Sequence, residues 1–389
     1  MIIKNGMVFG EDQTFTRRDL YIEKGKIVES VDCLTDLGEV DAQNLYVLPG
    51  LIDIHSHGAA GHDFSDGDPK GLEAILAYQY AHGITGYVPT TMSLPQEKLL
   101  EVLGSVEKSK EREWFELAGR RPGLARLLGI HLEGPFLDPS KRGAHREEAL
   151  CPPDVDFLKA CDRACGGRIR LLTLSPNLEG APELIRALKG AARTGTDRKD
   201  ICERLHISLG HTAADYETCR RAFEAGADHV THLFNAMNPF HHREPGLIGA
   251  AAEADCMVEL IADGIHVHES AVRAAFRLFP DRVVLVSDSM RGTGLKDGMY
   301  DLGGRQVQVQ GSRAALQDGT IAGSVTNLFD CMKKAVSFGI PLEEAVAAAT
   351  IHPARAIGLA DRVGSLAPGK DADVLLVNQK LELVSVNPV

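Results

Sequence analysis

Two histidines that could bind a metal ion, His55 and His57, follow a short apolar segment and are separated by one serine. Alternate residues of a strand point to the same side, so both imidazoles can reach one ion. Such a pair on its own is equally typical of a surface turn. Its position after an apolar segment, repeated by ligand-type residues after other apolar segments, favours a metal site.

Four further residues of this kind follow apolar segments: Glu133, His211, His232 and Asp288. A buried carboxylate without a partner is costly, so Glu133 needs either a metal ion or an arginine or lysine that the sequence does not identify. His211 or His232 alone would be a typical core histidine, but their matching positions favour metal ligation. Asp288 could cap a turn; facing several histidines, it is better explained as a catalytic base.

Eight apolar segments, alternating with helix-like stretches, would position these residues. They are Leu51–Ile54, Gly86–Thr90, Leu127–Leu132, Ile169–Leu174, Leu205–Gly210, His229–Leu233, Met257–Ala262 and Arg282–Ser287. Apolar strands that alternate with helices predict a parallel sheet buried on both faces. Eight such units over about 250 residues predict an α/β fold of the (β/α)8 or TIM-barrel type, in which the carboxyl ends of the strands share one face. A doubly wound sheet is the alternative, but HSHGAAG replaces the glycine-rich phosphate loop expected after its first strand.

The two ends of the chain differ from this middle region. Residues 1–50 and 356–389 read as short alternating strands and turns, including a hairpin turn at Lys24-Gly25-Lys26. We expect both ends to form one small β-sandwich domain beside a barrel of residues 51–355. A turn-rich stretch at 296–322 predicts a β-hairpin after the last barrel strand.

Composition excludes several classes of protein. The chain of 389 residues carries a formal net charge of −12, which disfavours nucleic acid and anionic membranes as partners. An anionic substrate would therefore need a local cluster of cations. The eight cysteines form no CxxC pair, the N-terminal stretch has no signal pattern, and no apolar run approaches about 18 residues. We expect reduced cysteines and a cytoplasmic location.

The sequence resembles the N-acetylglucosamine-6-phosphate deacetylases of the amidohydrolase superfamily. The matching segments are PGLIDIHSHG, HLEGPFLDPSKRGAH, LGHTAADY, THLFNAMNPFHHREPGLIGAA, IADGIHVH, LVSDSM, GTIAGS and GSLAPGKDADVLL. They extend over nearly the whole chain. HLEGPF followed by GAH, and THLFNAM followed by REPG, are specific as a set, whereas an HxH pair alone indicates only the superfamily.

The resemblance implies a role for each matching position. Glu133, His211 and His232 match the principal metal ligands, while His55 and His57 match a position that varies and that accompanies a second ion when both histidines are present. The ion or ions would be divalent, and zinc, iron, cobalt and manganese all suit such ligands. The resemblance also implies a homodimer and a phosphorylated amino sugar as the small-molecule partner.

The same resemblance assigns the catalytic and substrate positions. Asp288 matches the catalytic acid/base, and His145 matches the residue that contacts the substrate carbonyl. Arg243 and His266 would bind the phosphate and the sugar. The full set of matching substrate-binding residues is Ala144, His145, Asn235, Ala236, Arg243, His266, Ile321, Ala322, Gly323 and Ser324.

The implied reaction is hydrolysis of the acetamide of N-acetylglucosamine 6-phosphate to glucosamine 6-phosphate and acetate. A divalent ion lowers the pKa of its bound water to about 7, which supplies hydroxide at neutral pH. Asp288 would accept the water proton and return it to the departing amine, and His145 would help to stabilise the oxyanion, a contribution of about 3 kcal/mol per donor.

Several observations qualify this interpretation. The fourth apolar segment ends in TLSPN, so it lacks the carbamylated lysine of dihydroorotase-like relatives, and Glu133 would bridge the ions instead. Ser289 stands where the family more often has alanine, and its hydroxyl could hydrogen-bond Asp288. The last C-terminal strand should be short. The open alternatives are a deacetylase for another acetamido sugar phosphate, an enzyme for N-acyl amino acids, and a non-catalytic metal-binding relative.

Overall fold

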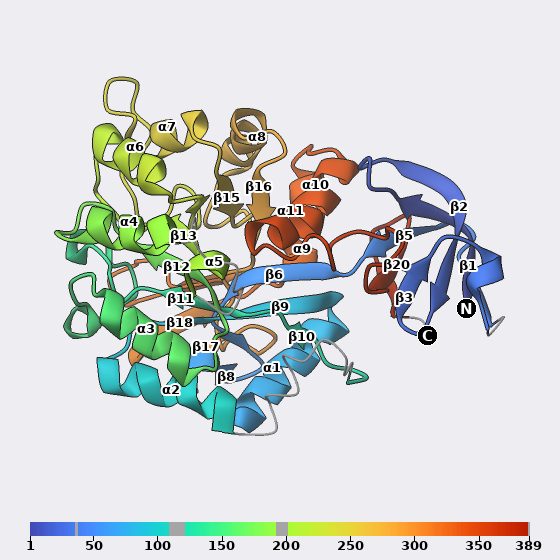
Figure 1. Cartoon of the computed structure of the whole chain (residues 1–389), viewed down its shortest axis with the longest axis horizontal. Helices are drawn as coiled ribbons and strands as arrows, with labels where there is room; N and C mark the ends of the chain where they lie inside the picture. The colour runs from blue at the N-terminus through green and yellow to red at the C-terminus, as the bar shows by residue number, and fades with distance from the viewer. Residues whose placement is uncertain (36–37, 109–120, 192–200, 388–389) are drawn as a thin grey trace.

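The structure is a computed structural model that describes residues 1–35, 38–108, 121–191 and 201–387. Eight parallel strands form its centre (Figure 1). They are β6 (Leu51–Ser56), β9 (Ile84–Thr91), β11 (Ile130–Glu133), β12 (Ile169–Leu174), β13 (His206–Leu209), β14 (His229–Val230), β15 (Met257–Leu260) and β16 (Val283–Leu285).

Neighbours in this sheet follow chain order from β6 to β16, as a (β/α)8 barrel requires. The amide of Asp288 donates to the carbonyl of His55 at 2.9 Å, which joins the segment after β16 to β6. The predicted barrel is therefore confirmed. The third predicted strand is interrupted: β10 (Arg126–Leu127) precedes Gly129, whose φ of 157° ends the first piece before β11 begins.

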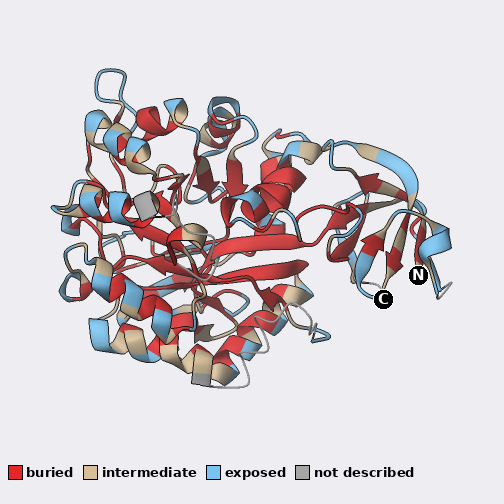
Figure 2. Cartoon of the chain, viewed as in Figure 1, coloured by how far each residue is buried: buried red, intermediate tan, exposed pale blue. Residues whose placement is uncertain are grey.

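Helices surround the barrel strands, which are buried along nearly their whole length (Figure 2). The α-helices are α1 (Pro69–Ala81), α2 (Gln96–Lys108), α3 (Val155–Ala164), α4 (Ala181–Ala191), α5 (Ile201–Arg204), α6 (Tyr216–Ala225), α7 (Gly246–Glu253), α8 (Glu269–Leu278), α9 (Leu328–Ser337), α10 (Leu342–Ala349) and α11 (Ile351–Ala356). Several begin at an aspartate whose carboxylate accepts backbone N–H groups of the first turn: Asp68 for α1, Asp154 for α3 and Asp215 for α6. The 3₁₀ helices among the described residues are Val31–Cys33, Phe64–Asp66, Pro139–Lys141 and Glu147–Ala149.

Both ends of the chain form a separate seven-stranded sheet at one end of the molecule (Figure 1). Its strands are β1 (Ile2–Phe9), β2 (Phe15–Glu23), β3 (Lys26–Val28), β4 (Glu39–Asp41), β5 (Leu45–Pro49), β20 (Val374–Asn378) and β21 (Leu383–Val386). β20 pairs antiparallel with β5, and apolar residues of both ends share one core. Both ends thus contribute to one sheet, which includes the predicted hairpin turn, where Lys24 and Gly25 both have positive φ. That the domain is a β-sandwich stays a prediction. The last strand is short, as expected; the exact domain boundaries stay a prediction.

The insertion after β16 forms a three-stranded antiparallel sheet: β17 (Gly298–Leu302), β18 (Arg305–Gln310) and β19 (Arg313–Ala315). The predicted hairpin corresponds to β17 and β18, and β19 extends it. Leu302, Val307 and Val309 are buried with Met92 and Met290, which fixes this sheet beside the end of the barrel. A short two-stranded sheet, β7 (Gly58–Ala59) with β8 (His62–Asp63), follows β6.

The cysteines and the helix lengths bear on two further expectations. Six of the eight cysteines are buried. Burial raises the pKa of Cys161 and Cys165 to about 12, so both are protonated and unreactive at neutral pH. Within the four described ranges, every helix is too short or too polar to cross a lipid bilayer.

Candidate metal and active site

Ionisable side chains meet at the carboxyl ends of the barrel strands, as the sequence predicts. Glu133 ends β11, His211 and His232 follow β13 and β14 by two residues, and Asp288 follows β16 by three. The last three have φ values of 46°, 27° and 47°. A non-glycine residue in this region costs about 1–3 kcal/mol. The strained turn carries each side chain inward, and all four residues are at most 7% exposed.

Glu133, His211 and His232 form the first candidate ligand group. The Nε2 atoms of His211 and His232 each lie 3.1 Å from Glu133 Oε1 and 3.0 Å from one another. His211 Nδ1 donates to the carbonyl of Lys141 at 2.9 Å, so its Nε2 presents a lone pair to the group. Electron-rich atoms packed this closely fit a divalent cation between them.

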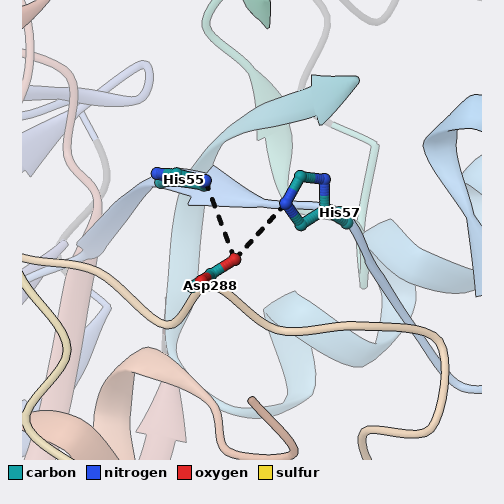
Figure 3. A group of neighbouring side chains, drawn as sticks. All are labelled: His55, His57 and Asp288. Atoms are coloured by element: carbon teal, nitrogen blue, oxygen red, sulfur yellow. Dashed lines mark ion pairs between the residues drawn. The ribbon is translucent and has the colours of Figure 1, made fainter. Parts of the chain in front are cut away.

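His55, His57 and Asp288 form a second group, shown in Figure 3. Asp288 Oδ1 lies 3.7 Å from His55 Nε2 and 3.3 Å from His57 Nε2. Glu133 lies between the groups, because its Oε1 is 3.4 Å from His55 Nε2 and its Oε2 is 3.2 Å from His57 Nε2. His57 Nδ1 donates to the carbonyl of Thr90 at 3.2 Å, which leaves Nε2 for an ion. His55, His57 and Asp288 could therefore hold a cation as well.

Glu259, in β15, is a site residue that the sequence prediction missed. Its carboxylate is fully buried and accepts from His55 Nδ1 at 2.7 Å, from the amide of His232 at 3.1 Å and from His229 Nε2 at 3.2 Å. It thus holds one histidine of each candidate ligand group. The only signal in the sequence is a single carboxylate inside an otherwise apolar strand.

In this site, neighbouring groups of opposite charge offset the effect of burial on the pKa of each ionisable side chain. Burial alone would raise the pKa of Glu133, but His55 and His145 outweigh it and hold that pKa well below its usual range. Burial opposes ionisation of Asp288 too, yet His55 and His57 keep its pKa below the ordinary value. Both carboxylates are therefore ionised at neutral pH. Burial disfavours protonation of His57, but Asp288 and Glu133 raise its pKa to about 10, so a cation binding there displaces a proton.

The side chain of His145 lies next to Glu133 and is in its neutral form. The amide of Ser93 donates to His145 Nδ1 at 3.1 Å, so the proton of the neutral ring is on Nε2. Burial lowers the pKa of His145 to about 4, although Glu133 acts to raise it. Nε2 lies 3.1 Å from Glu133 Oε2. At neutral pH this ring can donate a hydrogen bond to an oxygen in the site.

A cavity of about 490 Å³ lies over these groups. Eight of the ten predicted substrate-binding residues line it: Ala144, His145, Asn235, Ala236, His266, Ile321, Ala322 and Gly323. Ser324 is not in the lining; it is buried, and its amide and hydroxyl donate to the carbonyls of Asp288 and Ser287 at 2.7 and 2.5 Å. Arg243 is also outside the lining: it is exposed, and its guanidinium is 2.9 Å from His242 Nε2.

Cations that were not predicted also line this cavity: Lys141, Arg142 and Arg305. Arg305, from β18, donates to the carbonyl of Gly143 at 3.2 Å and so ties the insertion to the loop before His145. His266 Nδ1 lies 2.7 Å from Asp263 Oδ2; burial opposes its charge, but Asp263 raises its pKa above the ordinary value. The cavity thus offers the local cations that an anionic substrate requires in a chain of net negative charge.

The expectation for Ser289 is wrong. Its hydroxyl donates to the carbonyl of Gly58 at 2.9 Å and lies 2.7 Å from the hydroxyl of Ser56, so it braces the end of β6 and does not bond the Asp288 carboxylate. The closure of the barrel between β16 and β6 brings these residues together. The sequence alone does not reveal how these two segments are aligned.

Comparison with known proteins agrees with this geometry. Residues 196–388 match the model of the amidohydrolase family. The chain is 40% identical over 341 residues to the N-acetylglucosamine-6-phosphate deacetylase of Bacillus subtilis (87% of this chain, 82% of the relative), and 32% identical over 387 residues to the N-acetylgalactosamine-6-phosphate deacetylase of Escherichia coli O157:H7 (99% and 97%). A solved structure of N-acetyl-D-glucosamine-6-phosphate deacetylase from Mycobacterium smegmatis, an aspartate-to-alanine mutant in complex with N-acetyl-D-glucosamine-6-phosphate, superposes with a TM-score of 0.87 at 30% identity, over 99% of this chain and 97% of that one. This chain is a member of the N-acetylglucosamine-6-phosphate deacetylase family within the amidohydrolases.

Proposed function

We propose that this chain hydrolyses the acetamide of N-acetylglucosamine 6-phosphate to glucosamine 6-phosphate and acetate. The observation that carries the proposal is the convergence of Glu133, His211 and His232 with the ionised carboxylate of Asp288 beneath one cavity. A relative that had lost its catalytic activity would have no need of a base at that position. The names of the relatives agree with this substrate class.

A divalent cation fits Glu133, His211 and His232, and a second one fits His55 and His57 together with the carboxylates between them. A bound cation would lower the pKa of water and polarise the acetamide carbonyl. Zinc, iron, cobalt and manganese all suit imidazole and carboxylate ligands, and we propose that one or two ions of this type are bound per chain.

The chain's own residues handle the protons. Asp288, ionised at neutral pH, accepts a proton from the attacking water as the new carbon–oxygen bond forms. His145 donates a hydrogen bond from Nε2 to the carbonyl oxygen as negative charge develops there. Asp288 then gives its proton to the nitrogen, because an amine leaves poorly unless it is protonated, and the carbon–nitrogen bond breaks.

The substrate phosphate is assigned to His266 and Arg243. Because Arg243 is exposed and does not line the cavity of its own chain, we propose a homodimer in which a second copy of the chain supplies it. Replacing Arg243 by alanine should raise KM for N-acetylglucosamine 6-phosphate much more than for unphosphorylated N-acetylglucosamine. Equal changes for both sugars would contradict the phosphate role.

A deacetylase for N-acetylgalactosamine 6-phosphate is the second candidate, because one full-length relative carries that name. Acetate release from both hexosamine phosphates and from an N-acetyl amino acid, measured side by side, separates the candidates. We expect the highest kcat/KM for N-acetylglucosamine 6-phosphate. A preference for either other substrate would overturn the assignment, and bound metal without amidase activity would indicate a non-catalytic relative. We also propose a cytoplasmic location, since buried free thiols suit a reducing compartment.

A further inference from the structure

A second cavity, of about 830 Å³, lies at the opposite end of the barrel. We call it the amino-end cavity, because its walls include the starts of β12 and β13 together with α5 and the segment after α11 (Figure 1). Arg170 is the second residue of β12, whereas Thr173, further along that strand, pairs with Glu133. In a parallel barrel this places the amino-end cavity away from the candidate metal groups.

Four arginines line the amino-end cavity: Arg170, Arg204, Arg355 and Arg362. Two acidic residues, Glu203 and Asp361, line it as well, so cations exceed anions in a chain whose overall charge is −12. Two of the arginines have carboxylate neighbours: Arg204 pairs with Asp162, and Arg362 lies 3.8 Å from Asp371.

The other two arginines form no ion pair with a carboxylate within the described part of the chain. Arg170 donates from Nε to the carbonyl of Leu128 at 2.9 Å and from Nη1 to that of Ile357 at 3.3 Å, with no carboxylate within 4 Å. Arg355 is exposed, and no described residue forms an ion pair or hydrogen bond with its guanidinium. Burial, with repulsion from Arg204 and Arg362, lowers the pKa of Arg170 although the charge of Asp361 acts to raise it, so a bound anion would further stabilise the charged guanidinium.

The shape of the wall also admits a ligand. His206 is held by its Nδ1, which lies 2.9 Å from Asp228 Oδ2, and its Nε2 faces Gly358. A Cβ at position 358 would lie 3.3 Å from that Nε2, and Gly358 has a φ of 66°, so the absent side chain keeps this part of the cavity open. A planar guanidinium matches phosphate oxygens in a bidentate arrangement. We propose that the amino-end cavity is a binding site for a small phosphate-bearing anion.

Hydrogen–deuterium exchange tests this proposal, because it reports on peptides 201–207 and 354–363 separately from the metal groups. The probes are inorganic phosphate and glucosamine 6-phosphate, with sodium chloride at matched ionic strength. We expect slower exchange in these peptides with phosphate, with glucosamine 6-phosphate, or with both, and none with chloride. Protection by both would show that the phosphate group alone is recognised; protection by the sugar phosphate alone would show that the sugar contributes.

The matched variants replace arginines that lie at or near the surface. Arg355→Gln/Arg362→Gln removes two cavity cations, and the control Arg186→Gln/Arg220→Gln removes two from the exposed faces of α4 and α6. We expect Kd for the protecting phosphate to rise about tenfold or more in the first pair and to stay unchanged in the control. Thermal unfolding without phosphate establishes that both pairs fold. Absence of protection in the unsubstituted protein, equal protection by chloride, or equal loss in both pairs would overturn the proposal.

Discussion

Replacing Glu259 by glutamine should weaken metal binding although Glu259 belongs neither to the group of Glu133, His211 and His232 nor to the group of His55, His57 and Asp288; it could hold an ion only together with His55 and His131. Glu259 is buried, and its carboxylate accepts from His55 Nδ1 at 2.7 Å and from the amide of His232 at 3.1 Å. The bond to His55 fixes the tautomer that leaves Nε2 for an ion and increases the basicity of the ring. Glutamine keeps the size of the side chain but loses the charge that does this.

The size of the effect follows from these contacts. Carboxylates that orient a ligating imidazole typically account for about 10- to 100-fold in metal affinity. That corresponds to about 1.4–2.8 kcal/mol of binding free energy. The other oxygen of Glu259 accepts from His229 Nε2 at 3.2 Å. Whichever way the glutamine is turned, its NH₂ group therefore faces at least one of the groups that donate a hydrogen bond to Glu259. We therefore expect a loss of at least about tenfold, and the larger part of it at the ion that His55 would hold.

Competition with a chromophoric chelator measures this loss as a change in metal affinity, independently of turnover. The control is Glu253→Gln, because Glu253 is exposed at the end of helix α7, outside the candidate ligand groups, and its carboxylate accepts a hydrogen bond from the hydroxyl of Tyr216 at 2.6 Å. We expect the control to bind metal normally. An affinity of Glu259→Gln equal to that of the control, in a folded protein, would refute the orienting role of Glu259.

Three further changes test other parts of the account. Asp288→Asn should abolish acetate release while metal content stays largely intact, since asparagine tolerates the positive φ at this position but cannot accept the proton; near-normal turnover would contradict the assignment. Replacing His55 and His57 together by alanine should lower the metal stoichiometry measured by elemental analysis, and an unchanged stoichiometry would mean that they only shape a one-metal site. Arg126→Met should destabilise the protein in urea by about 1–3 kcal/mol, because two buried aspartates lose a shared hydrogen-bond donor, while Lys26 still pairs with Asp371 at 2.7 Å. A loss below 1 kcal/mol, where surface substitutions commonly fall, would show that this pair does not join β10 to the C-terminal segment.

The barrel could be predicted from the sequence because its strands are buried on both faces and read as continuous apolar runs. The candidate ligands could be predicted for the same reason: Glu133, His211 and His232 each interrupt or directly follow such a run. The hairpin turn at Lys24 could also be predicted, because a glycine, Gly25, stands between two alternating segments. In each case the information lies within a few consecutive residues.

Features that depend on contacts between distant segments could not be predicted. Glu259 looked like any isolated carboxylate until β15 placed it beside His55 from β6, 204 residues away. Ser289 turned toward Gly58 because of how the barrel closes, and Arg305 reached the cavity because the insertion folds over the barrel. The positive φ values at the strand ends are a property of the tertiary structure as well, since histidine and aspartate do not prefer them strongly enough to reveal them.

The central claim is that a divalent ion held by Glu133, His211 and His232 enables this chain to deacetylate N-acetylglucosamine 6-phosphate. The most direct test strips the protein of metal with a chelator and then restores one ion type at a time, while metal content and acetate release are measured on the same sample. We predict that acetate release from N-acetylglucosamine 6-phosphate vanishes in the stripped protein and rises in proportion to restored metal. Undiminished acetate release from metal-free protein, or full metal occupancy with no acetate release, would contradict the account.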